Sequence, residues 1–133
     1  MAKVKKPLVT EADLQSAVRA YLEKKWPGVP FTAFSAVQFT NVVARVQAKK
    51  MGSNSSYPDL CIFRARGGYH GLMIEFKAPD KVLYKKDGTL RKDEHFEKQL
   101  ARHEQLRAEG YAVHVVQEFA VAVRIIEDYL AQR

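Results

Sequence analysis

An acidic and a basic residue lie two positions apart inside one short apolar stretch, residues 71–77. An apolar run of this length that begins at a glycine is typical of a buried strand. Side chains alternate between the two faces of a strand, so Glu75 and Lys77 share one face while Ile74 and Phe76 share the other. Burying charged groups costs free energy unless they have partners. The stretch therefore indicates a functional site inside a sheet.

A second apolar run, residues 58–63, precedes this stretch, and Gly67-Gly68 lies between the two. Two short apolar runs separated by a glycine-rich turn predict a hairpin. Asp59 stands at the start of the earlier strand, so the hairpin can bring its carboxylate beside Glu75 and Lys77. Cys61 is the only cysteine, and its place in a strand predicts a buried, inert thiol rather than a nucleophile.

The pattern of Asp59, then fifteen residues, then Glu75 and Lys77 resembles the PD-(D/E)XK nuclease superfamily. Within it, the chain resembles the VRR-NUC family from about Glu11 to Val116. The segments that carry this closer resemblance are Met51-Gly52, Tyr57-Pro58-Asp59-Leu60, Ile74-Glu75-Phe76-Lys77, Gln99 with Leu106 seven residues later, and Gly110-Tyr111.

The resemblance implies a metal-dependent DNA endonuclease. Asp59, Glu75 and the backbone carbonyl of Phe76 would bind Mg²⁺ or Mn²⁺, ions that prefer oxygen ligands. Lys77 would stabilise charge on the phosphate and orient the attacking water, and its use as general base stays open. Gln99 would hold Lys77 or the water. Small stand-alone members are similar to phage or bacterial resolvases, which implies branched or Holliday-junction DNA as the substrate.

Thr10 predicts the N-cap of a first helix that begins at Glu11 and ends before Pro27-Gly28. Glu11 lies on the apolar side of this helix, one turn before Leu14. Two interpretations stay open. Glu11 is either a first-turn acid favoured by the helix dipole or a further metal ligand, which the family's first helix often supplies.

The remaining pattern predicts the other elements. Residues 31–43, rich in aromatic and β-branched side chains, predict a strand with its turn, and residues 44–51 a short helix. Asn41 resembles a family asparagine, with a plain turn residue as the alternative. Residues 94–109, 111–116 and 119–130 predict helix, strand and helix. This order predicts an α/β fold with a mixed sheet flanked by helices, and the resemblance implies a restriction-endonuclease-like αβββαβ core.

The helix over 94–109 carries polar residues on its apolar face. Phe96, Leu100 and Leu106 form the predicted buried stripe, and Gln99 and His103 share that face. Glutamine is unusual in a buried stripe, although a peripheral polar residue is the alternative. The histidines have no spacing typical of a zinc site; they are His70, His95, His103 and His114.

The formal net charge is +7, which favours a polyanionic partner such as DNA. A basic loop or hairpin is predicted at about 78–93, where a solvated insertion is the alternative. The predicted DNA-binding residues are Lys49, Lys50, Lys81, Lys85, Lys86, Arg91 and Lys92. Lys3, Lys5 and Lys6 belong either to a frayed terminus or to a basic arm.

A length of 133 residues predicts a single domain over 1–133. No apolar run reaches the ~18 residues that span a bilayer, so we expect a soluble cytoplasmic protein of bacterial or phage origin, with no membrane partner. Symmetric cutting of a junction needs two sites, which predicts a homodimer. Two other functions remain as alternatives, a nucleic-acid-binding module that does not cut and a non-catalytic interaction domain.

Overall fold

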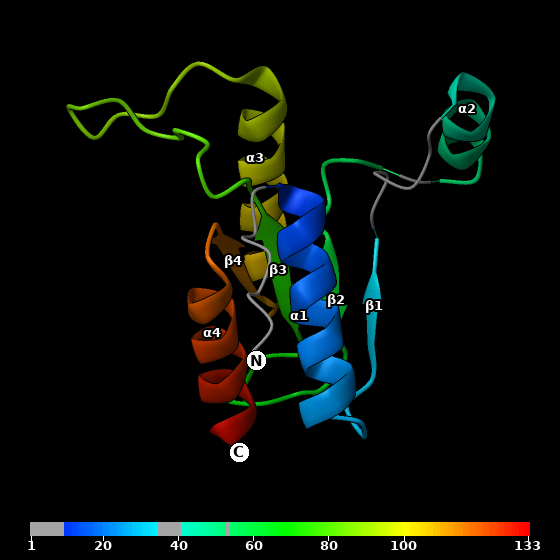
Figure 1. Ribbon diagram of the computed structural model, residues 1–133, viewed down its shortest axis with the longest axis vertical. Helices are drawn as coiled ribbons and strands as arrows, with labels where there is room; N and C mark the ends of the chain where they lie inside the picture. The colour runs from blue at the N-terminus through cyan, green and yellow to red at the C-terminus, as the bar shows by residue number, and fades with distance from the viewer. Residues whose placement is uncertain (1–9, 35–40, 53) are drawn as a thin grey trace, which may run out of the picture.

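The computed structural model describes residues 10–34, 41–52 and 54–133, so the predicted basic arm at Lys3, Lys5 and Lys6 lies outside the described residues. Four helices and four strands follow one another along the described chain (Figure 1). In chain order they are α1 (Glu11–Lys25), β1 (Phe31–Ala33), α2 (Val42–Lys50), β2 (Leu60–Ile62), β3 (Leu72–Phe76), α3 (Glu94–Ala108), β4 (Ala112–Val116) and α4 (Phe119–Ala131).

The strands form one mixed sheet in the order β1-β2-β3-β4. β2 pairs antiparallel with both β1 and β3, whereas β4 runs parallel to β3. The loop from β2 to β3 turns at Gly67 and Gly68, whose φ angles of 59° and 85° suit glycine. The parallel pair arises because α3 crosses over between β3 and β4. The predicted αβββαβ core is confirmed, with α2 inserted after β1 and α4 added at the end.

Helices cover both faces of the sheet. In Figure 1, α1 and α4 lie in front of it and α3 lies behind it. The larger core cluster joins Ile74 and Phe76 of β3 to α1 and α4, and it includes Leu14 and Ile126. The smaller cluster lies on the opposite face and contains Cys61, Met73 and Val113. β3 is therefore buried on both sides, and its Glu75 shares the α3 face with Met73. Cys61 is a buried free thiol, as predicted.

The segment after β1 differs from the prediction. The strand ends at Ala33 rather than running toward Val43, and α2 already begins at Val42. Residues 35–40 of the predicted strand and turn lie outside the described residues. Asn41 is the N-cap of α2, because its side-chain oxygen accepts a hydrogen bond from the Ala44 N–H at 2.7 Å. This cap starts a helix in spite of the β-branched residues that favoured a strand.

The buried stripe of α3 also differs from the prediction. Phe96 is buried, but Leu100 and Leu106 are only half-buried. The other fully buried positions of the helix are the polar residues Gln99 and His103. The most buried face of α3 is therefore partly polar and lies against the β3 face that carries Glu75.

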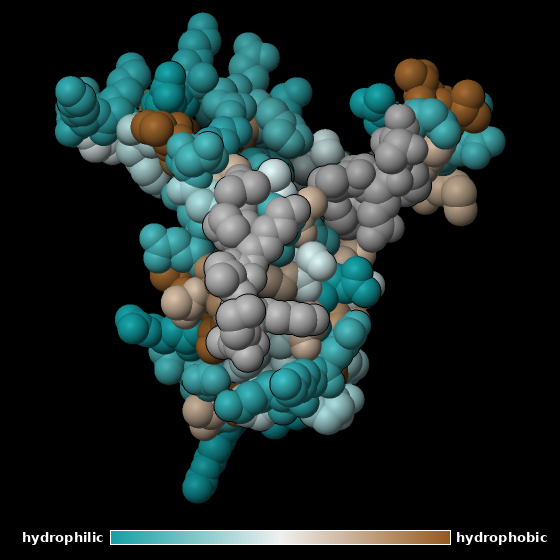
Figure 2. Space-filling view, in the orientation of Figure 1, coloured by the Kyte–Doolittle hydropathy of each residue, from teal (hydrophilic) through white to brown (hydrophobic). Residues whose placement is uncertain are grey.

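The segment between β3 and α3 contains a hairpin turn. Tyr84 bridges to Leu90, the Lys85 N–H donates to the Thr89 carbonyl at 2.7 Å, and Gly88 has a φ of 86°. This hairpin projects from the body in Figure 1, and most of its surface is hydrophilic in Figure 2, apart from a small hydrophobic patch. No helix of the described residues is long and apolar enough to cross a membrane.

Candidate active site

Two carboxylates meet where β2 begins and β3 ends. The register pairs Leu60 with Ile74, so Asp59 stands opposite Glu75 as the next pair along the ladder. Asp59 Oδ2 accepts a hydrogen bond from the Phe76 N–H at 2.8 Å. The Glu75 side chain is buried, while Asp59 is half-buried. The predicted hairpin therefore brings the two acids together, and the Phe76 backbone holds one of them.

The two carboxylates resist being charged at the same time. Burial, reinforced by the neighbouring Glu75, raises the pKa of Asp59 to about 8. Burial also raises the pKa of Glu75, and Glu11 adds to that rise, although Asp59 and Lys77 act in the opposite direction. Two adjacent acids of raised pKa favour either a shared proton or a cation beside them.

Lys77 follows directly after β3, and its side chain is buried on the α3 side of the sheet. Its Nζ donates to Gln99 Oε1 at 2.7 Å and lies 5.0 Å from the centre of the Phe96 ring. Gln99 in turn donates from Nε2 to the Ser55 carbonyl at 3.4 Å. Gln99 therefore fixes the ammonium group from α3 and is itself fixed by the loop before β2.

Arg102 attaches the same loop to α3. Its Nε donates to Ser56 Oγ at 3.1 Å, and its guanidinium stacks over the Tyr57 ring at 4.5 Å from the ring centre. The loop leads within two residues to Asp59. Packing against α3 therefore restrains the approach of the chain to the first carboxylate.

His103 is a residue of the site whose role the sequence did not reveal. It is fully buried, and its Nε2 lies 3.7 Å from Glu75 Oε1. Burial, together with the positive charges of Arg107 and Lys77, lowers the pKa of His103 to about 4. The imidazole is therefore neutral near pH 7, and the contact is not an ion pair. The one signal in the sequence was its position one turn after Gln99.

The donor set fits a hard divalent ion. Glu75 Oε1 is buried without a hydrogen-bond partner among the described residues, and Mg²⁺ typically takes one or two protein carboxylates and fills its shell with water. No cluster of three or more acid, His or Cys side chains in metal-binding arrangement occurs among the described residues. Glu11 acts on Glu75 electrostatically, and its use as a ligand stays a prediction.

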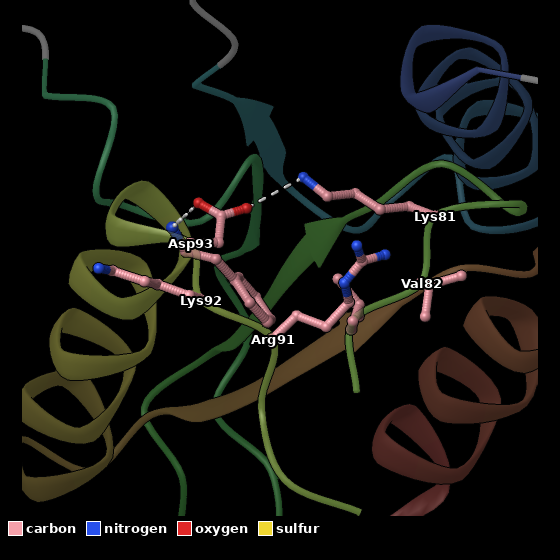
Figure 3. A pocket seen from close by; sticks show the side chains of 7 residues that line it. Lys81, Val82, Arg91, Lys92 and Asp93 are labelled. Atoms are coloured by element: carbon pink, nitrogen blue, oxygen red, sulfur yellow. Dashed lines mark hydrogen bonds and ion pairs between the residues drawn. The ribbon is translucent and has the colours of Figure 1, made fainter. Parts of the chain in front are cut away.

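A basic pocket adjoins this cluster. It encloses about 200 Å³, and Figure 3 shows its lining. Phe96, which packs against Lys77, is part of the wall. Lys81 pairs with Asp93 at 3.3 Å, while Asp93 also caps α3 by accepting from the Phe96 N–H at 3.0 Å. The lining residues are Lys81, Val82, Leu83, Arg91, Lys92, Asp93 and Phe96.

The other predicted DNA-binding residues lie further out. Lys85 and Lys86 are exposed near the tip of the hairpin, and Lys49 and Lys50 are exposed at the end of α2. In Figure 1 the hairpin and α2 project on either side of the end of β3. The structure therefore separates the predicted cations into two groups that flank the carboxylates.

Comparisons with known proteins bear on the resemblance to the VRR-NUC family. The sequence matches no family model, and no curated protein matches it. A solved structure named "VRR_NUC domain protein" is similar, with 28% sequence identity and a TM-score of 0.64. The match covers 93% of this chain and 90% of that one. This likeness supports the VRR-NUC resemblance, agrees with the restriction-endonuclease-like fold, and indicates a nuclease family.

Proposed function

We propose that this protein is a divalent-metal-dependent DNA endonuclease of the PD-(D/E)XK superfamily that selects branched DNA. One observation carries the proposal. Asp59, Glu75 and Lys77 lie together at the end of β3, and Gln99 reaches Lys77 from α3 at 2.7 Å. Two acids and a lysine at the end of β3, an interior strand of the sheet, form the group of side chains that phosphodiester hydrolysis needs.

The metal would be held by Asp59, Glu75 and the carbonyl of Phe76. A bound Mg²⁺ or Mn²⁺ ion supplies charge stabilisation and a water of lowered pKa. The raised pKa values of Asp59 and Glu75 support this assignment, because an ion beside two repelling carboxylates removes the repulsion. Glu11 would join from the first turn of α1, either directly or through a water.

Lys77 would place its ammonium group against the scissile phosphate and orient the attacking water. An ammonium has three donors, and Gln99 Oε1 occupies one of them. The remaining donors are available to oxygens of the phosphate and the water. Because Gln99 and Phe96 fix the group in advance, little reorganisation is needed when negative charge develops.

DNA would lie across the end of β3, between the hairpin and α2. The exposed lysines on both projections support this path, and so does the basic pocket beside Phe96. Contacts to phosphates by Lys and Arg supply affinity without reading sequence. A protein that acts in this way would work in the cytoplasm of a bacterium, encoded by the cell or by a phage.

Symmetric cutting of a four-way junction would require two sites. Each chain carries one cluster, and a symmetric dimer pairs two clusters for two cuts. The interface would come from α4 or from the hairpin; Phe119 and Val121 of α4 leave 37% and 42% of their surface exposed. Sedimentation at working concentration tests this step, since a strictly monomeric particle removes the resolvase assignment and leaves the nuclease assignment.

A cleavage assay tests the function. The substrates are linear, flap and four-way-junction DNAs of matched length, each with Mg²⁺, Mn²⁺ or EDTA. We expect metal-dependent cutting of the branched DNAs in preference to the linear one. Tight binding of the same DNAs without any cutting would instead identify a non-cleaving nucleic-acid-binding module.

A further inference from the structure

Within the described part of the chain, three buried polar atoms lack hydrogen-bond partners, and all of them belong to one pair of residues. Among the side chains that the structure describes, these atoms are Glu75 Oε1 and both ring nitrogens of His103. Both side chains are almost fully buried. Buried polar groups in native proteins are normally paired, so an orphaned pair at the site needs an explanation.

Glu75 and His103 face each other because one turn of α3 is about as long as two residues of β3. Four residues along a helix advance by ~6 Å, and two residues along a strand advance by ~6.6 Å. Gln99 contacts Lys77, and one helical turn later His103 lies beside Glu75. One turn further, Leu106 packs against the cluster that contains Met73. Successive turns of α3 therefore lie against Lys77, Glu75 and the cluster that contains Met73.

We propose that His103 is a positioning residue that orients Glu75, donating from Nε2–H to Oε1 and leaving the second carboxylate oxygen free for the metal. The inference rests on the proposed function, because it gives Glu75 the role of a ligand. The 3.7 Å separation is beyond hydrogen-bond length. Hydrogen bonds of active-site residues are often long before the reacting complex forms and tighten within it.

His103 acts through Glu75 and does not touch the substrate. It has no exposed surface, so DNA cannot reach the imidazole. The Nε2–H of His103 would hold Glu75 in one rotamer. Hydrogen bonds from neighbouring residues commonly orient metal ligands in this way. Gln99 would then position Lys77, and His103 would position the carboxylate of Glu75.

A matched set of variants tests the role by metal binding. His103→Leu fills the space but has no donor, and His103→Gln offers a donor again. His95→Leu makes the same change at an exposed position of the same helix. We expect His103→Leu to weaken Mn²⁺ binding by ~10–100-fold in calorimetry, with His103→Gln recovering most of the affinity and His95→Leu matching the wild type.

A second variant pair separates positioning from packing. In a Glu75→Gln background, the ligand charge is gone, so adding His103→Leu should change Mn²⁺ affinity no further. If His103 only fills the core, His103→Leu lowers stability by the same amount in both backgrounds and leaves Mn²⁺ affinity unchanged. An unchanged affinity in folded His103→Leu overturns the inference, as does a wild type that binds no Mn²⁺.

Nitrogen NMR of the wild type gives a readout that does not depend on any variant folding. With Mg²⁺ bound, the ¹⁵N shifts of His103 should report a neutral ring protonated on Nε2. A ring protonated on Nδ1 overturns the inference. A wild type that binds Mn²⁺ and shows the expected tautomer but cuts no DNA would remove the nuclease assignment alone, so the two failures are distinguishable.

Discussion

Lys77 Nζ donates to Gln99 Oε1 at 2.7 Å, and both side chains are buried between β3 and α3. This bond joins residues that lie 22 positions apart in the chain. It links the strand that carries the acid and the lysine to the helix on the same face. The arrangement of the candidate active site depends on how α3 lies against β3.

Removing the partner of Lys77 should therefore affect both stability and cutting. Gln99→Leu leaves a buried ammonium without its acceptor, and we expect a loss of about 2 kcal/mol in the free energy of unfolding. Cleavage should fall while DNA binding persists, since the exposed cations stay in place. Urea unfolding and single-turnover cleavage measure the two effects.

Gln105→Leu is the control for this variant, because Gln105 lies on the same helix and its hydrogen bond, accepted from Arg102 at 2.7 Å, is exposed rather than buried. Its stability and cleavage should remain near those of the wild type. If Gln99→Leu and Gln105→Leu changed the free energy of unfolding and the cleavage rate equally, the bond to Lys77 would contribute no more than an exposed hydrogen bond.

The strand pair that carries the site could be predicted from the sequence. Alternation put Glu75 and Lys77 on one face of a strand, and the glycine turn brought Asp59 opposite Glu75. These relationships are local, since the two strands are neighbours in the chain and their side chains follow the period of two. The contact of His103 with Glu75 could not be predicted, because it depends on the long-range register of α3 against β3.

The start of α2 could not be predicted from the sequence, for a different reason. Val42 and Val43 favour a strand by type, yet they begin a helix, because the cap at Asn41 decides the local structure. Both valines remain exposed, at 67% each, so no burial pattern marked where the predicted helix begins. Where no core face is present, hydrophobic periodicity gives no signal.

The stability of the metal-free protein should fall as pH rises from 6 to 9. The pKa of Asp59 is about 8 in the folded protein against an ordinary value near 3.8, so the folded state binds the extra proton between these values. Its stabilising effect is full below about pH 4 and is lost as pH rises through 8. Chemical unfolding in EDTA should therefore show a lower free energy of unfolding at pH 9 than at pH 6.

Two comparisons check the origin of this pH dependence. Asp59→Asn has no carboxyl to titrate, so its stability should vary less over the same range. Mg²⁺ should raise the stability of the wild type most at high pH, because the ion binds the ionised carboxylates of the folded state. A wild-type curve that rises between pH 6 and 9 in EDTA would be evidence against the raised pKa.

The basic hairpin should carry part of the DNA affinity. Replacing Lys85, Lys86, Arg91 and Lys92 by alanine removes cations on one side of the end of β3. We expect weaker binding and a shallower dependence on salt, by roughly 0.9 in the log–log slope for each phosphate that the protein no longer neutralises. Fluorescence anisotropy at several salt concentrations measures both quantities.

Lys24→Ala/Lys25→Ala is the control for charge alone. These lysines are exposed at the last turn of α1, at the opposite end of the molecule from the hairpin in Figure 1. Their replacement should leave the slope nearly unchanged. If both sets of variants weaken binding in proportion to the charge removed, the hairpin is a solvated insertion.

The roles assigned within the site separate under mutation. Asp59→Asn and Glu75→Gln keep the shape of the side chains but remove ligand charge, so metal affinity and cleavage should fall together. Lys77→Ala keeps both carboxylates, so metal should still bind. Its cleavage rate should fall by ~10²–10³, since a preorganised charge at the phosphate is gone. DNA binding should persist in all three variants.

Metal titration by calorimetry, run beside single-turnover cleavage for wild type, Asp59→Asn and Lys77→Ala, tests the central claim most directly. The account predicts that Asp59→Asn loses metal binding and cutting, whereas Lys77→Ala binds metal but cuts slowly. Cleavage at the wild-type rate by either variant would contradict the assignment of Asp59, Glu75 and Lys77 as a nuclease site.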